Sequence, residues 1–97
     1  MATPIRRLVL DVMKPHEPDV LEFADVVADG AGVAGVDVSL IETDRDVQNL
    51  KVTLEGEDID ATAVEAAIEG LGGTVHSIDA VARGEHIVDE RDTPQDR

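Results

Sequence analysis

Residues that could bind a cation occur at three places in the chain. They are Asp11 at the end of an aliphatic run, His16 and Glu17 in the segment KPHEP, and Asp44 and Asp46 in the segment TDRD. Calcium and magnesium prefer oxygen ligands and need several of them, which acidic loops can supply. One hypothesis is therefore a calcium or magnesium site formed by these five residues. The chain has no EF-hand spacing, and 22 acidic residues among 97 make chance clusters common.

The prolines of KPHEP also have a purely structural explanation. Pro15 and Pro18 restrict the residues before them to extended conformations, and Pro18 suits the first position of a helix. Turn formation likewise accounts for Asp44. We interpret the segment first as a stiff connector between a strand and a helix. The alternative is a rigid support that directs His16 and Glu17 toward a ligand.

Other kinds of chemistry find little support. The chain has no cysteine, which excludes disulfides, zinc-thiolate sites, iron-sulfur clusters and thiol catalysis. Ser39 and Ser77 are expected on strands, away from a strained nucleophile turn. The glycines at 30–35 and 72–73 each follow a helix and lead into a strand, so they are interpreted as turns and not as phosphate loops. We expect a protein that is not an enzyme. A site between subunits is the less favoured enzymatic alternative.

The charge balance restricts the partners and the location. The 22 acidic residues exceed the 8 basic ones, which gives a formal net charge of −14. Nucleic acid and anionic membranes require a basic surface, so neither is expected as a partner. Scarce lysine and a core with Phe23 as its only aromatic residue are typical of a protein from a high-salt cytoplasm, where screening weakens self-repulsion. No apolar run is long enough for a membrane span or a signal peptide, and we expect a cytoplasmic protein.

The elements that position the candidate residues follow from the hydrophobic periodicity. Strands are expected at residues 5–12, 35–43, 47–56 and 74–82, and helices at residues 18–30 and 60–71. Leu8, Leu10 and Val12, for example, alternate with residues of the opposite face, as in a half-buried strand. Asp60 suits the cap of the second helix, and the glycine pair at 72–73 suits its end.

This βαββαβ order predicts an α+β, ferredoxin-like sandwich, with a four-stranded antiparallel sheet and two helices on one face. Residues 1–88 are expected to form a single domain, followed by an acidic, disordered tail at 89–97. The first and third strands should be central. The connections at 13–17, 43–46 and 72–73 should then share one end of the sheet, which would bring most of the candidate ligands together.

Three stretches of the chain carry a resemblance to a known family. RRLVLDVMKPHEP, GVDVSLIETDRDVQNLKVTLEGEDID and IEGLGGTVHSIDAV resemble an archaeal family catalogued as domain of unknown function 211, over about Ile5 to Val88. The resemblance implies a ferredoxin-like fold and a tendency to form homo-oligomeric rings, and it implies no established activity. This chain departs from the family in its acidic surface and in the tail DERDTPQDR.

The sheet face that the helices leave open is the surface we favour for function. It is expected to present side chains of both charges together with two apolar residues: Arg7, Val9, Asp11, Asp37, Ser39, Ile41, Asn49, Lys51, Thr53, Glu55 and Asp79. Such a face could meet another subunit, which would supply counter-charges to its basic residues. The sequence therefore favours a non-enzymatic, self-assembling binding or scaffold protein that forms homo-oligomeric rings. The alternative is a protein that binds or senses calcium or magnesium through its acidic loops.

Overall fold

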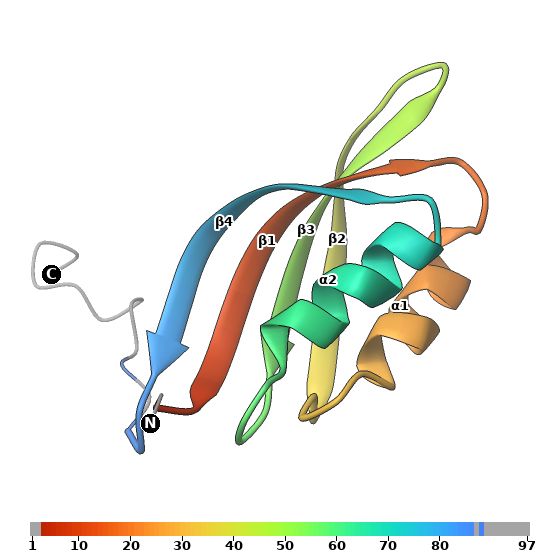
Figure 1. Ribbon diagram of the computed structural model, residues 1–97. Helices are drawn as coiled ribbons and strands as arrows, with labels where there is room; N and C mark the ends of the chain where they lie inside the picture. The colour runs from red at the N-terminus through yellow and green to blue at the C-terminus, as the bar shows by residue number, and fades with distance from the viewer. Residues whose placement is uncertain (1–2, 87, 89–97) are drawn as a thin grey trace, which may run out of the picture.

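Strands and helices follow one another in the order βαββαβ (Figure 1). The computed structural model describes residues 3–86 and 88. Within them the elements are β1 Ile5–Pro15, α1 Val20–Ala28, β2 Gly35–Thr43, β3 Val47–Glu55, α2 Ala61–Gly70 and β4 Thr74–Arg83. The strands form one antiparallel sheet in the order β2-β3-β1-β4, with both helices on one face. This confirms the predicted ferredoxin-like fold. The tail predicted at 89–97 lies outside the described residues.

The core lies between the helices and the two central strands. Leu8, Leu10 and Val12 of β1 stand opposite Leu54, Val52 and Leu50 of β3, and all six side chains are buried. Phe23, Val27, Val64 and Ile68 cover them from the helices. Each such side chain contributes about 1.5–3 kcal/mol when it is withdrawn from water. The alternation predicted for the central strands is therefore the pattern of the core.

Both helices begin at an aspartate. The Asp19 carboxylate accepts a hydrogen bond from the Glu22 N–H at 2.9 Å, and the Asp60 carboxylate accepts one from Ala63 at 3.0 Å. An N-cap of this kind stabilises a helix by about 1 kcal/mol. The predicted cap at Asp60 is confirmed. The prediction that Pro18 occupies the first helical position is wrong, because Asp19 caps the helix and Pro18 precedes that cap, joined to Glu17 by a cis peptide bond.

The end of α2 returns the chain to the end of β1. Gly72 adopts a φ of 88°, which favours glycine, and its N–H donates to the Glu69 carbonyl at 3.0 Å. The Gly73 N–H donates to the Ile68 carbonyl, also at 3.0 Å. These two bonds form a Schellman motif, so the predicted helix end is confirmed. A β-carbon at Gly72 would lie 3.3 Å from the Pro15 ring.

The first strand is longer than the predicted range of 5–12. Pairing with β3 continues through Lys14, opposite Gln48, to Pro15, opposite Val47. Lys14 and Pro15 therefore belong to the sheet, and the connector to α1 is shorter than KPHEP suggested. Within the described residues, no helix is long and apolar enough to cross a membrane.

The pairing of both edge strands is irregular, and the central strand β1 also has one extra residue, Arg6, in its pairing with β4. One extra residue interrupts β2 at Ile41, and two extra residues, His76 and Asp79, interrupt β4. Such bulges bend a strand and increase its twist. The sheet is accordingly curved, and the C-terminal half of β4 runs beyond the region that the helices cover (Figure 1).

Candidate functional site

The loops that carry most of the predicted cation ligands meet at one end of the sheet, as expected. The Nε2 atom of His16 lies 2.8 Å from the main-chain oxygen of Asp44. Since a carbonyl oxygen can only accept, Nε2 carries the proton in this contact, and a neutral ring keeps Nδ1 as an acceptor. Glu17 follows His16 directly, Asp46 is two residues after Asp44, and both side chains are exposed. The segment KPHEP therefore touches the β2–β3 turn through one histidine.

The Asp44 carboxylate already has partners within its own turn. Its Oδ1 atom accepts hydrogen bonds from the N–H groups of Asp46 and Val47, each at 2.9 Å. The bonds from Val47 and Asp46 lower the pKa of Asp44, and the charge of His16 adds to this effect against an opposing influence of desolvation. The turn explanation for Asp44 thus agrees with the structure.

Asp11 lies apart from this cluster. It sits four residues before the end of β1, about 13 Å along a strand. The Asn49 side-chain amide donates to its carboxylate at 2.5 Å. Among the described residues, no three histidine or acidic side chains are grouped so that they could hold a metal ion. Within one chain His16 thus contacts Asp44, but the five predicted ligands do not lie together. Cation binding stays a prediction.

Lys14 is a residue of this region that the sequence reasoning missed. Its side chain is fully buried, and its ammonium group donates to the carbonyl oxygens of Pro15, at 2.8 Å, and Pro18. Desolvation lowers the pKa of Lys14, although the charges of Asp19 and Glu17 oppose the shift. Continued alternation could have found it, because position 14 is in phase with the buried residues at 8, 10 and 12. The buried Lys14 side chain thus holds the segment KPHEP in place through hydrogen bonds to two of its carbonyl oxygens.

Next to Lys14 lies a buried polar atom without a partner. The Oε1 atom of Gln48, directly across the ladder from Lys14, makes no hydrogen bond within the described part of the chain. An unpaired buried acceptor of this kind costs about 1–3 kcal/mol. Gln48 and Lys14 together make the β1–β3 pair polar at the C-terminal end of β1, in contrast to the aliphatic core formed by the rest of the two strands.

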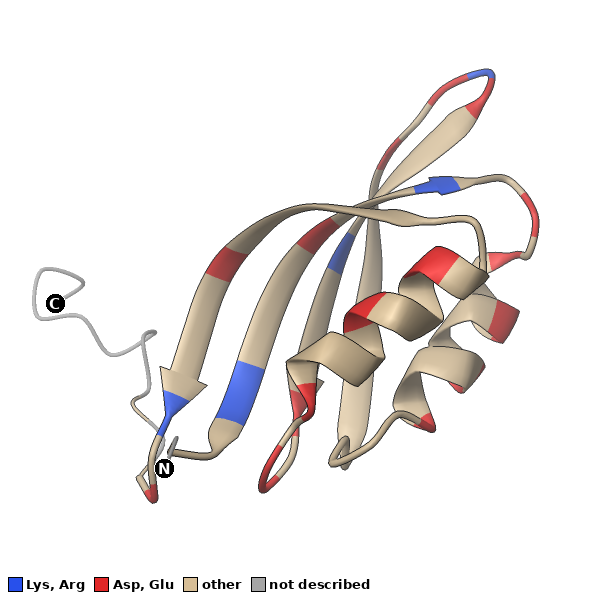
Figure 2. Ribbon diagram, viewed as in Figure 1, with Lys and Arg blue, Asp and Glu red and all other residues tan. Residues whose placement is uncertain are grey.

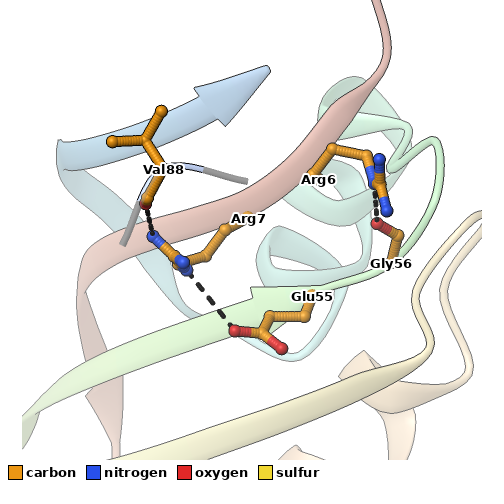
Figure 3. Close-up of polar contacts among 5 residues, drawn as sticks. All are labelled: Arg6, Arg7, Glu55, Gly56 and Val88. Carbon is orange, nitrogen blue, oxygen red and sulfur yellow. Dashed lines mark hydrogen bonds and ion pairs between the residues drawn. The ribbon is translucent and has the colours of Figure 1, made fainter. Parts of the chain in front are cut away.

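Arg7 on the open face of the sheet is paired within the chain. Its guanidinium lies 3.4 Å from the Glu55 carboxylate and 3.3 Å from the carbonyl oxygen of Val88 (Figure 3). The neighbouring Arg6 donates to the main-chain oxygen of Gly56 at 3.2 Å. The expectation that another subunit supplies the counter-charge is therefore unnecessary for Arg7.

Two serine–aspartate pairs also form hydrogen bonds on the open face. Ser39 donates to Asp37 at 3.3 Å, and Ser77 donates to Asp79 at 2.7 Å. Val9, expected to offer apolar surface here, is itself buried. A surface hollow of about 770 Å³ lies over β2 and β3 and includes Lys51 in its lining. The open face thus combines short polar contacts with a shallow depression.

Apolar surface is exposed at the two edges of the sheet. On β2, Leu40 is 49% and Ile41 is 58% exposed; on β4, Ile78 is 62% and Val81 is 52% exposed. Acidic side chains occur on strands, helices and loops alike, whereas lysine and arginine are few (Figure 2). Exposed aliphatic side chains on unpaired strands are a recognised template for association. The edges are therefore the most distinctive surface of the described chain.

Comparison with known proteins agrees with the resemblance noted in the sequence. The sequence model of a family described as "Uncharacterized ArCR", domain of unknown function 211, matches residues 6–97. A protein of Methanocaldococcus jannaschii, itself named only as uncharacterized, is 45% identical over 93 residues. The matched part covers 96% of this chain and 96% of that protein.

Proposed function

The chain belongs to the family of domain of unknown function 211, and from that premise we propose that it is a non-enzymatic, self-assembling scaffold or binding protein. Copies of the chain form a closed homo-oligomeric ring in a high-salt cytoplasm. The observation that carries the proposal is the exposure of aliphatic side chains on both edge strands. Singly exposed apolar residues are common, but a pair on each unpaired edge favours contact with another chain.

The composition adds an energetic reason for assembly. A small domain without tryptophan or tyrosine buries only aliphatic side chains and one phenylalanine, so its own core provides limited stability. Association removes further apolar surface from water at about 25 cal/mol per Å². The charge of −14 on each copy opposes association at low ionic strength. Molar salt shortens the screening length to about 3 Å, which relieves this repulsion.

The measurement that tests the proposal is the molar mass in solution. Light scattering after size exclusion, in molar KCl, should give a defined multiple of the 10.3 kDa chain, and the mass should fall when KCl is reduced. The Thr62→Lys/Ala66→Lys variant, which changes two exposed positions on α2, serves as the control and should keep the wild-type mass. A monomer at every salt concentration would exclude the proposal.

Cation binding is the second candidate, and the contact between His16 and the Asp44 turn is the observation that favours it. Neighbouring subunits of a ring could add the ligands that one chain lacks. Calcium or magnesium, compared with a chelator in the same KCl, should then raise the melting temperature of the wild type. The response should be lost in His16→Gln/Asp46→Asn and kept in Glu65→Gln/Glu69→Gln, which neutralises acids of α2. An unchanged melting temperature would dismiss this candidate.

A further inference from the structure

Three apolar rows cross the helix side of the sheet from one edge to the other. Each row takes one residue from every strand, and no row contains a polar residue. In the order β2-β3-β1-β4 the rows are Val36, Leu54, Leu8, Val81; then Val38, Val52, Leu10, Ile78; then Leu40, Leu50, Val12, Val75. The central members are buried, whereas Leu40, Ile78 and Val81 at the ends are about half exposed or more. The core of this sheet therefore has no polar boundary at either edge.

The helix layer leaves the β4 end of these rows open. Although α2 packs against β4, the C-terminal half of that strand extends beyond both helices (Figure 1). Val81 lies in this half, and Ile78 lies at the middle of the strand. They occupy core positions of the register, opposite Leu10 and Leu8, yet both are more than half exposed, so neither helix of the described chain covers them fully. Their exposure thus comes from the placement of the helices, not from an outward orientation.

We propose that copies of this chain associate head to tail through their edge strands, β4 of one subunit pairing antiparallel with β2 of the next. The inference rests on the self-assembly proposed above and specifies its contact. Both β1 and β2 run antiparallel to β3, and β4 runs antiparallel to β1, so the two edges of one sheet run in opposite directions. A second copy in the same orientation therefore presents β2 antiparallel to β4, the arrangement that joins every neighbouring pair within the sheet.

The contact satisfies groups that a single chain leaves open. Within the part of the chain that the structure describes, each edge strand has a row of main-chain N–H and C=O groups without a strand partner, and pairing provides one. The three apolar rows then continue from subunit to subunit. In the next subunit α1 packs against β2, so the contact brings that helix toward the uncovered Ile78 and Val81. A second copy of this chain supplies both a strand and a helix for the open end of the rows.

Such a contact uses different surfaces on the two partners. A heterologous contact of this kind closes into a ring when the rotation between neighbours allows it. The bulges at Ile41, His76 and Asp79 bend the two edge strands, and this curvature turns each copy relative to the last. Such a rotation argues against a flat, extending sheet, and a defined molar mass distinguishes a closed ring from an open filament.

The experiment blocks one edge at a time. Ile78→Lys/Val81→Lys blocks β4, and Leu40→Lys/Ile41→Lys blocks β2. Lysine reduces the net negative charge, so a loss of association cannot result from added repulsion between subunits. Each variant by itself should be a monomer of 10.3 kDa in molar KCl. Mixed in equal amounts, the two should form a dimer of twice that mass and nothing larger, since the mixture has one compatible pair of edges.

The outcomes separate this contact from self-assembly in general. A monomeric wild type in molar KCl would overturn the proposed function itself. An oligomeric wild type whose edge variants still oligomerise by themselves, or whose mixture stays monomeric, would overturn only the head-to-tail contact. Circular dichroism checks that each variant is folded. If the double variants do not fold, amide hydrogen exchange of the wild type in molar KCl decides, because raising the protein concentration should increase the protection of β2 and β4 more than that of β1 and β3; an equal change in all four strands would overturn the contact.

Discussion

Of the two lysines in the chain, Lys14 is buried and Lys51 is exposed. This difference can be isolated in solution, because the chain contains no tyrosine and no cysteine. Between about pH 9 and pH 11, only lysine side chains change their charge to a large extent. Burial disfavours the charged form of Lys14 and lowers its pKa below the ordinary 10.5. The unfolded chain, in which this lysine is hydrated, holds its proton to higher pH.

The first prediction follows from this difference in proton binding. The free energy of unfolding should rise as the pH increases from the lowered pKa of Lys14 toward 10.5, because the unfolded state binds more protons in that interval. Urea denaturation in constant KCl measures the slope. Lys14→Met should abolish the slope, and should cost about 1–3 kcal/mol at neutral pH because two carbonyls lose their donor. Lys51→Met should retain the slope; a slope that persists in Lys14→Met contradicts the prediction.

The loop between α1 and β2 and the loop between β3 and α2 are in contact at two glycines. A β-carbon at Gly56 would lie 1.9 Å from the Gly32 main-chain oxygen, and one at Gly32, where φ is 81°, would lie 2.0 Å from that of Asp58. The Asp60 N–H donates to the Ala31 carbonyl across the same contact at 3.0 Å. The backbones of the two loops therefore touch with no room for a side chain, which ties the exit of α1 to the entry of α2.

Gly56→Ala should therefore destabilise the fold by about 1–3 kcal/mol or more, because backbone atoms rather than flexible side chains must move. Gly70→Ala is the matched control: nothing lies near its β-carbon, and alanine favours the last turn of α2, so stability should rise by up to about 1 kcal/mol. Thermal and urea unfolding of both variants in the same KCl give the comparison. Equal effects at the two positions would show that the loops tolerate separation.

The order of the strands and helices could be predicted from the sequence, whereas the exposure and separation of particular residues could not. Strand alternation and helical spacing were sufficient for the element order, the Asp60 cap for the start of α2, and the glycines at 72–73 for its end. The strand at 74–82 was predicted, but its core positions were not: the apolar residues at 75, 78 and 81 recur every three positions because each bulge inserts one residue, which breaks the alternation of a regular strand. Their exposure also depends on how far the helices reach, which no local pattern encodes. The separation of Asp11 from His16 likewise required a strand longer than its apolar run.

The whole molecule is dominated by negative charge with little internal compensation. Within the described residues, Arg7 and Glu55 form the one ion pair closer than 4 Å. An exposed pair contributes at most about 1 kcal/mol, so it cannot balance a net charge of −14. Repulsion between carboxylates therefore acts against the compact state in dilute buffer, and dissolved cations reduce it.

The melting temperature should consequently rise with KCl from tenths of molar to about 1 M, where the screening length is about 3 Å. The increase should be smaller in Asp25→Asn/Glu65→Gln/Glu69→Gln, which removes three exposed charges from the helices. Replacing these acids leaves the core and both caps unchanged. A wild-type melting temperature that does not respond to KCl would contradict the electrostatic origin of the effect.

The placement of both helices on one face has a consequence for recognition. Where sheets join edge to edge in the same orientation, every open face lies on the same surface of the assembly, so identical polar contacts such as Arg7 with Glu55 repeat at regular intervals. A partner with matching repeats can bind several copies at once. Its second contact then forms at an effective concentration of the order of millimolar, and avidity can exceed the affinity of one copy by about 10²–10⁴-fold. Binding to several copies at once would thus provide the selectivity that the small, shallow surface of one copy lacks.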